Sequence, residues 1–163
     1  MAQSNGLLAV PPQRPVLPPI PDRGNKLDTG IIFTDGVFDM LHANHVKVLE
    51  GAKKLGEYLV IAVATDKLAE TYKRRPIICE EERLFMVQSL ACVDEAYLMS
   101  GPLDASGMEL ILERYRPRAV VYGGDATPEF YQPAERAGIM IRPAYRPGIN
   151  SSAIIDTILS GAR

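Results

Sequence analysis

From Gly30 onward, short apolar runs alternate with segments of helical period, and this alternation constrains the fold more than any other feature of the sequence. The apolar runs are expected strands at 31–33, 58–64, 96–99, 119–122 and 139–141. Helices are expected at 42–55, 80–90, 108–115, 129–137 and 151–159. Such alternation is typical of a parallel sheet with helices on both faces. The sequence therefore predicts an α/β fold with a Rossmann-like, doubly wound, five-stranded parallel sheet.

Composition excludes several classes of function. A chain of 163 residues, 47% of them hydrophobic, suits one domain with one core. The formal net charge of −2 argues against sequence-independent binding of nucleic acid. No apolar run approaches the roughly 20 residues that span a bilayer, and the first residues lack the pattern of a signal peptide. Cys79 and Cys92 do not form a cluster in the sequence, and we expect both to be reduced thiols. We expect a cytoplasmic protein that binds neither nucleic acid nor membrane.

Residues 1–28 form a proline-rich N-terminal arm ahead of a domain at 29–163. Six of the 13 prolines lie between Pro11 and Pro21, and such a stretch favours polyproline II over strand or helix. Its composition favours a disordered tail. The alternative is a strap across the domain or a partner subunit, because the arm has apolar residues to bury: Leu7, Leu8, Val16, Leu17 and Ile20.

The segment between the first expected strand and helix reads TDGVFDMLHANH, from Thr34 to His45. His42 and His45 are three residues apart and share one helix face. The start of a helix offers free N–H groups and the positive end of its dipole, so the pair predicts a polyphosphate site. Gly36 allows close approach of the backbone to a ligand. Metal ligation and ordinary surface histidines are the alternatives, but no third metal ligand lies nearby in the sequence.

Three elements in order resemble the cytidylyltransferase-like nucleotidyltransferases, whose signature is His-x-Gly-His after Gly-x-Phe-Asp. They are the segment ending at His45, the acidic run Glu80–Arg83, and Gly148–Ser152, and the likeness extends from about 30 to 158. The chain is most similar to the glycerol-3-phosphate and ethanolamine-phosphate cytidylyltransferases. The adenylyltransferase domain of ADP-heptose synthase is a near rival, because it shares Gly-Val-Phe-Asp and Gly-Gly-Asp.

Two departures from the family pattern lie in the site. Asn44 stands where the family has glycine between the histidines, and Asn150 stands where it usually has serine. The Asn44 side chain either narrows the space beside the nucleotide or donates its amide to a phosphate or a base.

The resemblance implies a role for each site residue. The catalytic residues would be His42, His45, Lys73 and Arg146. Acceptor binding would fall to Arg74 and Arg83, and no side chain is expected to ligate a metal. The residues expected to bind the nucleotide are Thr34, Asp35, Gly36, Phe38, Asn44, Gly124, Asp125, Asn150, Ser151 and Ser152.

Some of these residues also have plainer explanations. Lys73, Arg74 and Arg75 could be a solvated loop, although three adjacent cations favour a phosphate site. Gly124 and Asp125 suit an ordinary turn. Ser151 and Ser152 could be simple helix caps, which is compatible with phosphate binding. The role of Asp39 is open between orienting a histidine and orienting a backbone turn.

The resemblance implies transfer of CMP from CTP to a small phosphate- or phosphonate-bearing acceptor, with release of pyrophosphate. Mg²⁺ would be bound mainly through the triphosphate, and a homodimer is expected. One alternative is an adenylyltransferase using ATP on a sugar phosphate or cofactor precursor. Another is a catalytically silent nucleotide-binding protein, which only Asn44 favours. Gly-x-x-x-x-Gly-Lys-Ser/Thr is absent, and so is Gly-x-Gly-x-x-Gly after the first strand, which disfavours P-loop and dinucleotide-binding proteins.

Overall fold

The computed structural model describes residues 30–123, 128–143 and 148–161. Within them, five parallel strands form one sheet in the order β3-β2-β1-β4-β5. The strands are β1 (Ile31–Gly36), β2 (Tyr58–Ala64), β3 (Glu95–Met99), β4 (Ala119–Val121) and β5 (Met140–Ile141). The predicted α/β class and doubly wound parallel sheet are confirmed. The proline-rich arm, Gly124, Asp125 and Arg146 lie outside the described residues.

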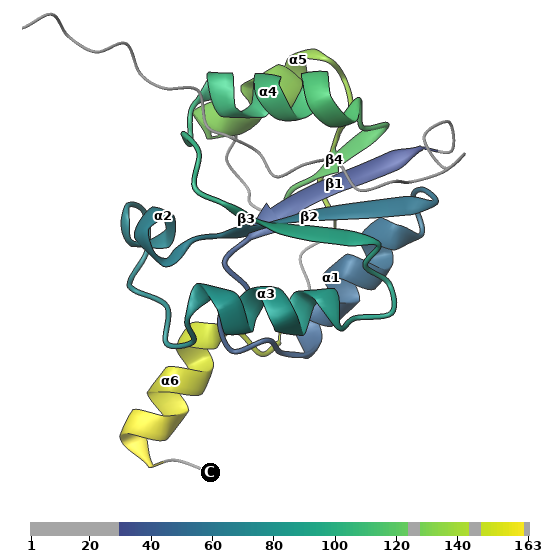
Figure 1. Cartoon of the computed structure of the whole chain (residues 1–163). Coiled ribbons are helices and arrows are strands. Elements are labelled where there is room, and N and C mark those ends of the chain that lie inside the picture. Colours follow the sequence, from purple (N-terminus) through teal and green to yellow (C-terminus); the bar gives the residue numbers. More distant parts are fainter. Residues whose placement is uncertain (1–29, 124–127, 144–147, 162–163) are drawn as a thin grey trace, which may run out of the picture.

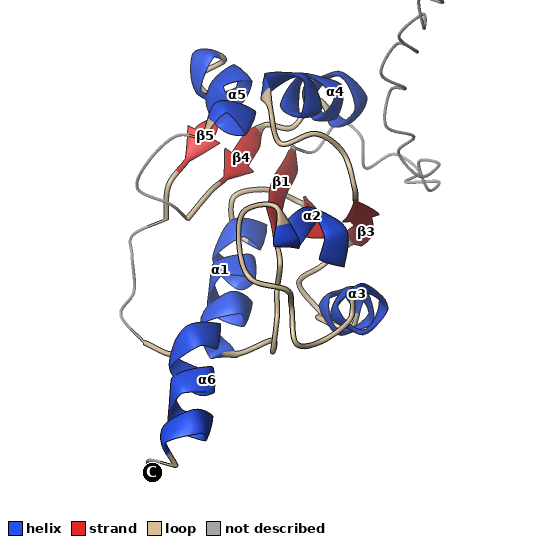
Figure 2. Ribbon diagram, turned by 90° about the vertical axis from the view of Figure 1, so that its left-hand side faces the viewer, coloured by secondary structure: helices blue, strands red, loops and turns tan. Residues whose placement is uncertain are grey.

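Two layers of helices cover the sheet (Figure 1). One layer contains α1 (Ala43–Lys53) and α3 (Glu80–Gln88). The other contains α4 (Ala105–Tyr115), the 3-10 turn η2 (Glu129–Tyr131) and α5 (Gln132–Arg136). Two further helices are α2 (Asp66–Glu70), beside the end of the sheet, and α6 (Ser151–Ser160), which projects beyond α1 (Figure 2).

The helices differ from the sequence expectations in three places. α2 was not expected, because five residues are too few to show a helical period. The helix expected at 129–137 is a 3-10 turn followed by a short α-helix. α4 begins three residues early, because the Asp104 side chain accepts the backbone N–H groups of Ser106 and Gly107 and caps the helix.

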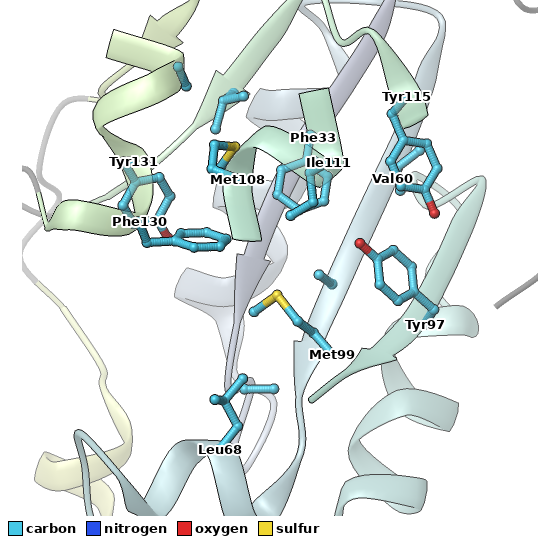
Figure 3. Packing of buried hydrophobic residues seen from close by; sticks show 14 of the residues in the cluster. Phe33, Val60, Leu68, Tyr97, Met99, Met108, Ile111, Tyr115, Phe130 and Tyr131 are labelled. Atoms are coloured by element: carbon cyan, nitrogen blue, oxygen red, sulfur yellow. The ribbon is translucent and has the colours of Figure 1, made fainter. Parts of the chain in front are cut away.

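Strand alternation divides the core into two clusters. Phe33 of β1 packs with Met108 of α4 and Tyr131 of η2 (Figure 3), and Ile31 belongs to the same cluster. Ile32, between them, packs toward α1 and α3 with residues such as Leu49. Every residue of β2 is buried, as expected for a strand enclosed by helices on both faces.

The order of the strands places a crevice at one edge of the sheet. The chain builds β2 and β3 on one side of β1 and then crosses to build β4 and β5 on the other. At the carboxyl end of β1, Gly36 pairs with Val63 of β2, and Thr34 pairs with Val121 of β4. Ligands of doubly wound sheets bind outside such carboxyl ends, where the strand order reverses.

No helix in the described ranges is long and apolar enough to cross a membrane. Cys79 and Cys92 are free cysteines, as expected.

Candidate active site

A cavity of about 600 Å³ opens at the carboxyl end of β1. It gathers residues from the β1–α1 segment, the loop before α3, the end of β4 and the start of α6. The predicted site residues that line it are Thr34, Asp35, Gly36, Phe38, His42, Asn44, His45, Lys73, Arg74, Asn150, Ser151 and Ser152. The crevice expected from the topology is therefore where the sequence elements converge.

The two histidines project together from the first turn of α1 into this cavity. His42 is the N-cap residue and His45 lies one turn on. Their rings stack with centroids 3.8 Å apart and planes inclined by 18°. The backbone N–H of His42 donates to Nδ1 of His45 at 3.4 Å, which leaves Nε2 to carry the proton of the neutral His45 ring. The pair thus presents hydrogen-bond donors at the positive end of a helix.

The surroundings of both imidazoles lower their pKa, which favours the neutral form of each ring near pH 7. Burial, together with the nearby charges of His42 and Lys73, lowers the pKa of His45 to about 4, and Asp39 opposes these effects. Burial also lowers the pKa of His42. Nδ1 of His42 is buried and has no partner among the described residues. A ligand anion that supplies a partner would stabilise protonated histidine and raise these pKa values.

The ring of Phe38 packs against the ring of His45. Phe38 has a left-handed backbone with φ of 55°, and its ring meets the His45 ring edge-on at 5.4 Å. A Cβ atom at Gly36 would lie 3.1 Å from the Phe38 ring. Glycine at this position therefore makes room for Phe38, a packing reason in addition to the expected approach of a ligand.

Asp39 connects three segments of the site. Its carboxylate accepts the backbone N–H groups of Ile77 and Ile78 and pairs with Arg74 at 2.8 Å. Its carbonyl oxygen accepts the Ser151 hydroxyl at 2.8 Å. Burial alone would raise the pKa of Asp39, but these N–H groups and Arg74 lower it overall. These bonds support the second of the two roles left open by the sequence, in which Asp39 orients a backbone turn, here the one before α3.

The basic cluster is divided between the cavity and the surface. Lys73 and Arg74 line the cavity, and Arg74 is held there by Asp39. Arg75 faces away and lies 3.5 Å from Glu70 in an exposed ion pair. Lys73 is thus available to an anionic ligand, whereas Arg74 would have to share a guanidinium that already bonds to Asp39 and to the Arg75 carbonyl.

Arg83 does not reach the cavity. Its side chain is fully buried, with Nη2 on Asp66 at 2.6 Å and Nε on the Ile78 carbonyl at 2.9 Å. Nη1 donates to the Val37 carbonyl. This placement corrects the prediction that Arg83 binds the acceptor, because all three of its nitrogens already bond within the protein. Arg83 instead braces the loop that leads to the histidines.

The start of α6 is tied to the start of α1. The Asn44 amide donates to the Ile149 carbonyl at 2.8 Å, so it bonds to the backbone rather than pointing freely at a ligand. Asn150 caps α6, because its side chain accepts the Ala153 N–H at 2.8 Å. With the Ser151 hydroxyl on Asp39, these bonds bring two helix N-termini to one cavity.

The end of β1 supplies one buried hydroxyl and one carboxylate. The Thr34 hydroxyl donates to the Val121 carbonyl at 2.9 Å and so holds β1 against β4. Asp35 accepts the Tyr131 hydroxyl at 2.7 Å. Sequence reasoning missed Tyr131, which lies 96 residues from Asp35 and belongs to no recognisable motif.

A family model described as cytidylyltransferase-like matches residues 33–155, nearly all of the domain that contains this cavity. The chain belongs to the cytidylyltransferase-like family. The resemblance drawn from the three sequence elements is thereby confirmed. Arg146, Gly124 and Asp125, which the resemblance also assigns to the site, are not among the described residues.

Relatives of the cytidylyltransferase-like chain include two bifunctional HldE proteins and an FAD synthase. HldE of Citrifermentans bemidjiense is 35% identical over 144 residues, 85% of this chain and 28% of that protein. HldE of Trichlorobacter lovleyi is 39% identical over 101 residues, 61% of this chain and 20% of that protein. The FAD synthase of Picrophilus torridus is 48% identical over 67 residues, 41% of this chain and 48% of that protein. The chain thus spans between a fifth and a half of the length of these relatives.

Among solved structures, the lipopolysaccharide core biosynthesis protein from Thermoplasma volcanium GSS1 superposes with a TM-score of 0.57 at 30% sequence identity. The match covers 70% of this chain and 93% of that chain. It supports the nucleotidyltransferase type of doubly wound sheet.

Proposed function

We propose that this protein transfers the nucleoside monophosphate part of a nucleoside triphosphate to a small phosphate- or phosphonate-bearing acceptor and releases pyrophosphate. One observation is central: the stacked His42 and His45 rings face a cavity that they share with Lys73 and the start of α6. Two helix N-termini, two imidazoles and two cations in one cavity suit a polyphosphate.

The chemistry requires positioning more than activation. An acceptor phosphate oxygen attacks the α-phosphorus in line, forming a new P–O bond as the bond to the β-phosphate bridging oxygen breaks. Pyrophosphate leaves with that electron pair. The acceptor is largely ionised near neutral pH, so no protein nucleophile is required. His42 and His45 donate to α- and β-phosphate oxygens as charge develops, while Lys73 and Arg74 balance the charge of the two anions.

The nucleotide is proposed to be CTP, as the sequence resemblance implies. ATP is at least as well supported, because one relative is an FAD synthase, whose product contains an adenine nucleotide. The resemblance to the adenylyltransferase of ADP-heptose synthase points the same way.

Mg²⁺ is proposed to arrive with the triphosphate. The cavity presents imidazole, ammonium, guanidinium and hydroxyl groups that suit phosphate oxygens, and its two carboxylates, Asp35 and Asp39, bond to Tyr131 and Arg74. In the described ranges, no group of three His, Cys, Asp or Glu side chains is placed to hold a metal ion. When present, the ion would neutralise phosphate charge during transfer.

A homodimer is also proposed, and α6 supports it. This helix has no buried residue, and Ile158 and Leu159 are 69% and 79% exposed. Exposed apolar side chains on a projecting helix favour burial against another surface.

A pyrophosphate-release screen tests the activity. The four nucleoside triphosphates are each combined with a panel of small phosphates and phosphonates, and CTP and ATP are compared directly. Substituting alanine for His42 or His45 is expected to lower kcat by roughly 10²- to 10³-fold, because each ring donates to developing charge. Arg136→Ala, on an exposed residue of α5, is the matched control. Near-normal turnover in both histidine variants would contradict the assignment, and nucleotide binding without any pyrophosphate release would favour the silent alternative.

A further inference from the structure

Two carboxylates line a cavity that otherwise presents groups suited to phosphate. Asp39 already bonds to Arg74 and to the N–H groups of Ile77 and Ile78, which leaves Asp35 as the carboxylate with room for a ligand. Asp35 is the fifth residue of β1 and lines the cavity. Its Oδ1 accepts the Tyr131 hydroxyl at 2.7 Å. Among the described residues, no second donor bonds to this carboxylate. A negative charge at this point would repel a triphosphate, so the carboxylate suits a ligand group that donates hydrogen bonds.

Asp35 and the histidines lie on opposite sides of the sheet edge. Side chains alternate along β1, so Asp35 lies on the same face as Ile31 and Phe33, where it meets Tyr131. His42 and His45 enter from α1, in the other layer. The cavity therefore has a phosphate side at the start of α1 and a second side at Asp35.

The charge of Lys73 acts on groups of both sides, Asp35 and His45. Burial raises the pKa of Asp35 to about 6, against the opposing effects of the Tyr131 hydrogen bond and the Lys73 charge. Lys73 also lowers the pKa of His45. Lys73 lines the same cavity as Asp35 and the two histidines, so an anionic group bound by Lys73 would lie within the cavity that they share. Because burial disfavours the charged carboxylate, a ligand donor that bonds to it would be favoured.

We propose that Asp35 selects the acceptor: its free carboxylate oxygen accepts a hydrogen bond from a hydroxyl or ammonium group of the acceptor, whose phosphate lies toward Lys73. This inference rests on the proposed function and narrows it. The acceptor is a small phosphate or phosphonate that also bears a hydroxyl or amino group. Tyr131 acts as a positioning residue, because its hydroxyl fixes one oxygen of the carboxylate and leaves the other for the acceptor.

Three small phosphates distinguish a hydroxyl donor from an ammonium donor on the acceptor. Glycerol phosphate offers hydroxyl groups, aminoethyl phosphate offers an ammonium group, and propyl phosphate offers neither. The wild-type protein is expected to prefer the first two over propyl phosphate by about 10- to 100-fold in kcat/KM, as a hydrogen bond to a charged group implies. Asp35→Ala is expected to abolish this preference. Asp35→Asn, which keeps an acceptor oxygen without the charge, is expected to retain the preference for hydroxyl and lose that for ammonium.

The sequence resemblance assigns Asp35 to the nucleotide, and the same variants test whether the nucleotide or the metal ion is its partner instead of the acceptor. The KM for the triphosphate and the half-saturating Mg²⁺ concentration are expected to change less than threefold, on the order of ordinary error in such comparisons. A larger change in either, with unchanged acceptor preference, would overturn the proposal. Thermal unfolding of each variant checks that the fold is intact, and the near-isosteric Asp35→Asn provides a second test if Asp35→Ala unfolds.

Binding measurements distinguish failure of this inference from failure of the proposed function. Calorimetric titration of the three phosphates into the wild-type protein needs no turnover. If no acceptor yields pyrophosphate, the proposed function fails. Tighter binding of glycerol or aminoethyl phosphate than of propyl phosphate, lost in Asp35→Ala, would still support the role of Asp35. Equal binding of all three phosphates would refute it.

Discussion

Replacing Arg83 with methionine is expected to destabilise the domain rather than change its acceptor preference. The Arg83 side chain is 1% exposed and bonds to Asp66, to the Ile78 carbonyl and to the Val37 carbonyl. Breaking a buried ion pair costs about 3–5 kcal/mol. The Asp66 side chain is 24% exposed and regains water when its partner is lost, so the lower end of about 3 kcal/mol applies.

Thermal unfolding measures this effect. For a domain of this size, 1 kcal/mol shifts Tm by about 3–5 °C, so Arg83→Met is expected to lower Tm by roughly 10–15 °C. Arg83→Lys keeps the charge but cannot make the three bonds, and it is expected to fall between Arg83→Met and the wild type. The matched control is Arg136→Met. Arg136 lies 3.8 Å from Glu109 in an exposed pair, so this change is expected to cost less than about 0.5 kcal/mol.

Acceptor kinetics provide the measurement that could contradict this role of Arg83. If Arg83→Met unfolds at the wild-type temperature while the KM for the acceptor rises tenfold or more, Arg83 contacts the acceptor and the structural role is refuted.

Three further perturbations follow from the site and from α6. The pKa of His45 is about 4 in the folded protein and 6.5 in the unfolded chain. The contribution of His45 to stability is therefore present above pH 6.5 and is lost as the pH falls toward 4. The urea midpoints of His45→Gln should depend less on pH over this interval than those of the wild type. Asn44→Gly restores the family residue but removes the bond to Ile149, and steady-state kinetics should show a fall of about three- to tenfold in kcat/KM for the triphosphate; an unchanged value would mean that this bond does not position the start of α6. Ile158→Glu places a charge on the exposed face of α6 and should shift the proposed dimer toward monomer in light scattering at micromolar concentration, whereas an equal mass for variant and wild type would place any interface elsewhere.

Much of the fold could be predicted because its signals are local. The apolar run 58–64 matches β2 residue for residue, and the alternation of elements gave the parallel sheet. α2 escaped prediction because a five-residue helix depends on one cap, in which Thr65 accepts the Leu68 N–H, rather than on a repeated period. Boundaries such as the start of α4 likewise depend on single capping bonds.

The site was predictable where the chemistry lies within a short segment. His42 and His45 share a helix turn, so their spacing alone predicted that they act together. Asp39 was recognised without a role, since its partners Ile77 and Ile78 lie nearly forty residues away. The spacing of Arg83 after an acidic run gave no information on which way its side chain points.

By itself, the sequence determined the class of sheet, the family, and the histidine pair at the first helix, because these depend on periods and spacings within a few residues. The tertiary structure decided which charged side chains face the cavity. It turned Arg83 inward to Asp66 and placed Tyr131 against Asp35. These partners lie 17 and 96 residues apart, and only the folded arrangement of the strands and helices determines which distant side chains meet.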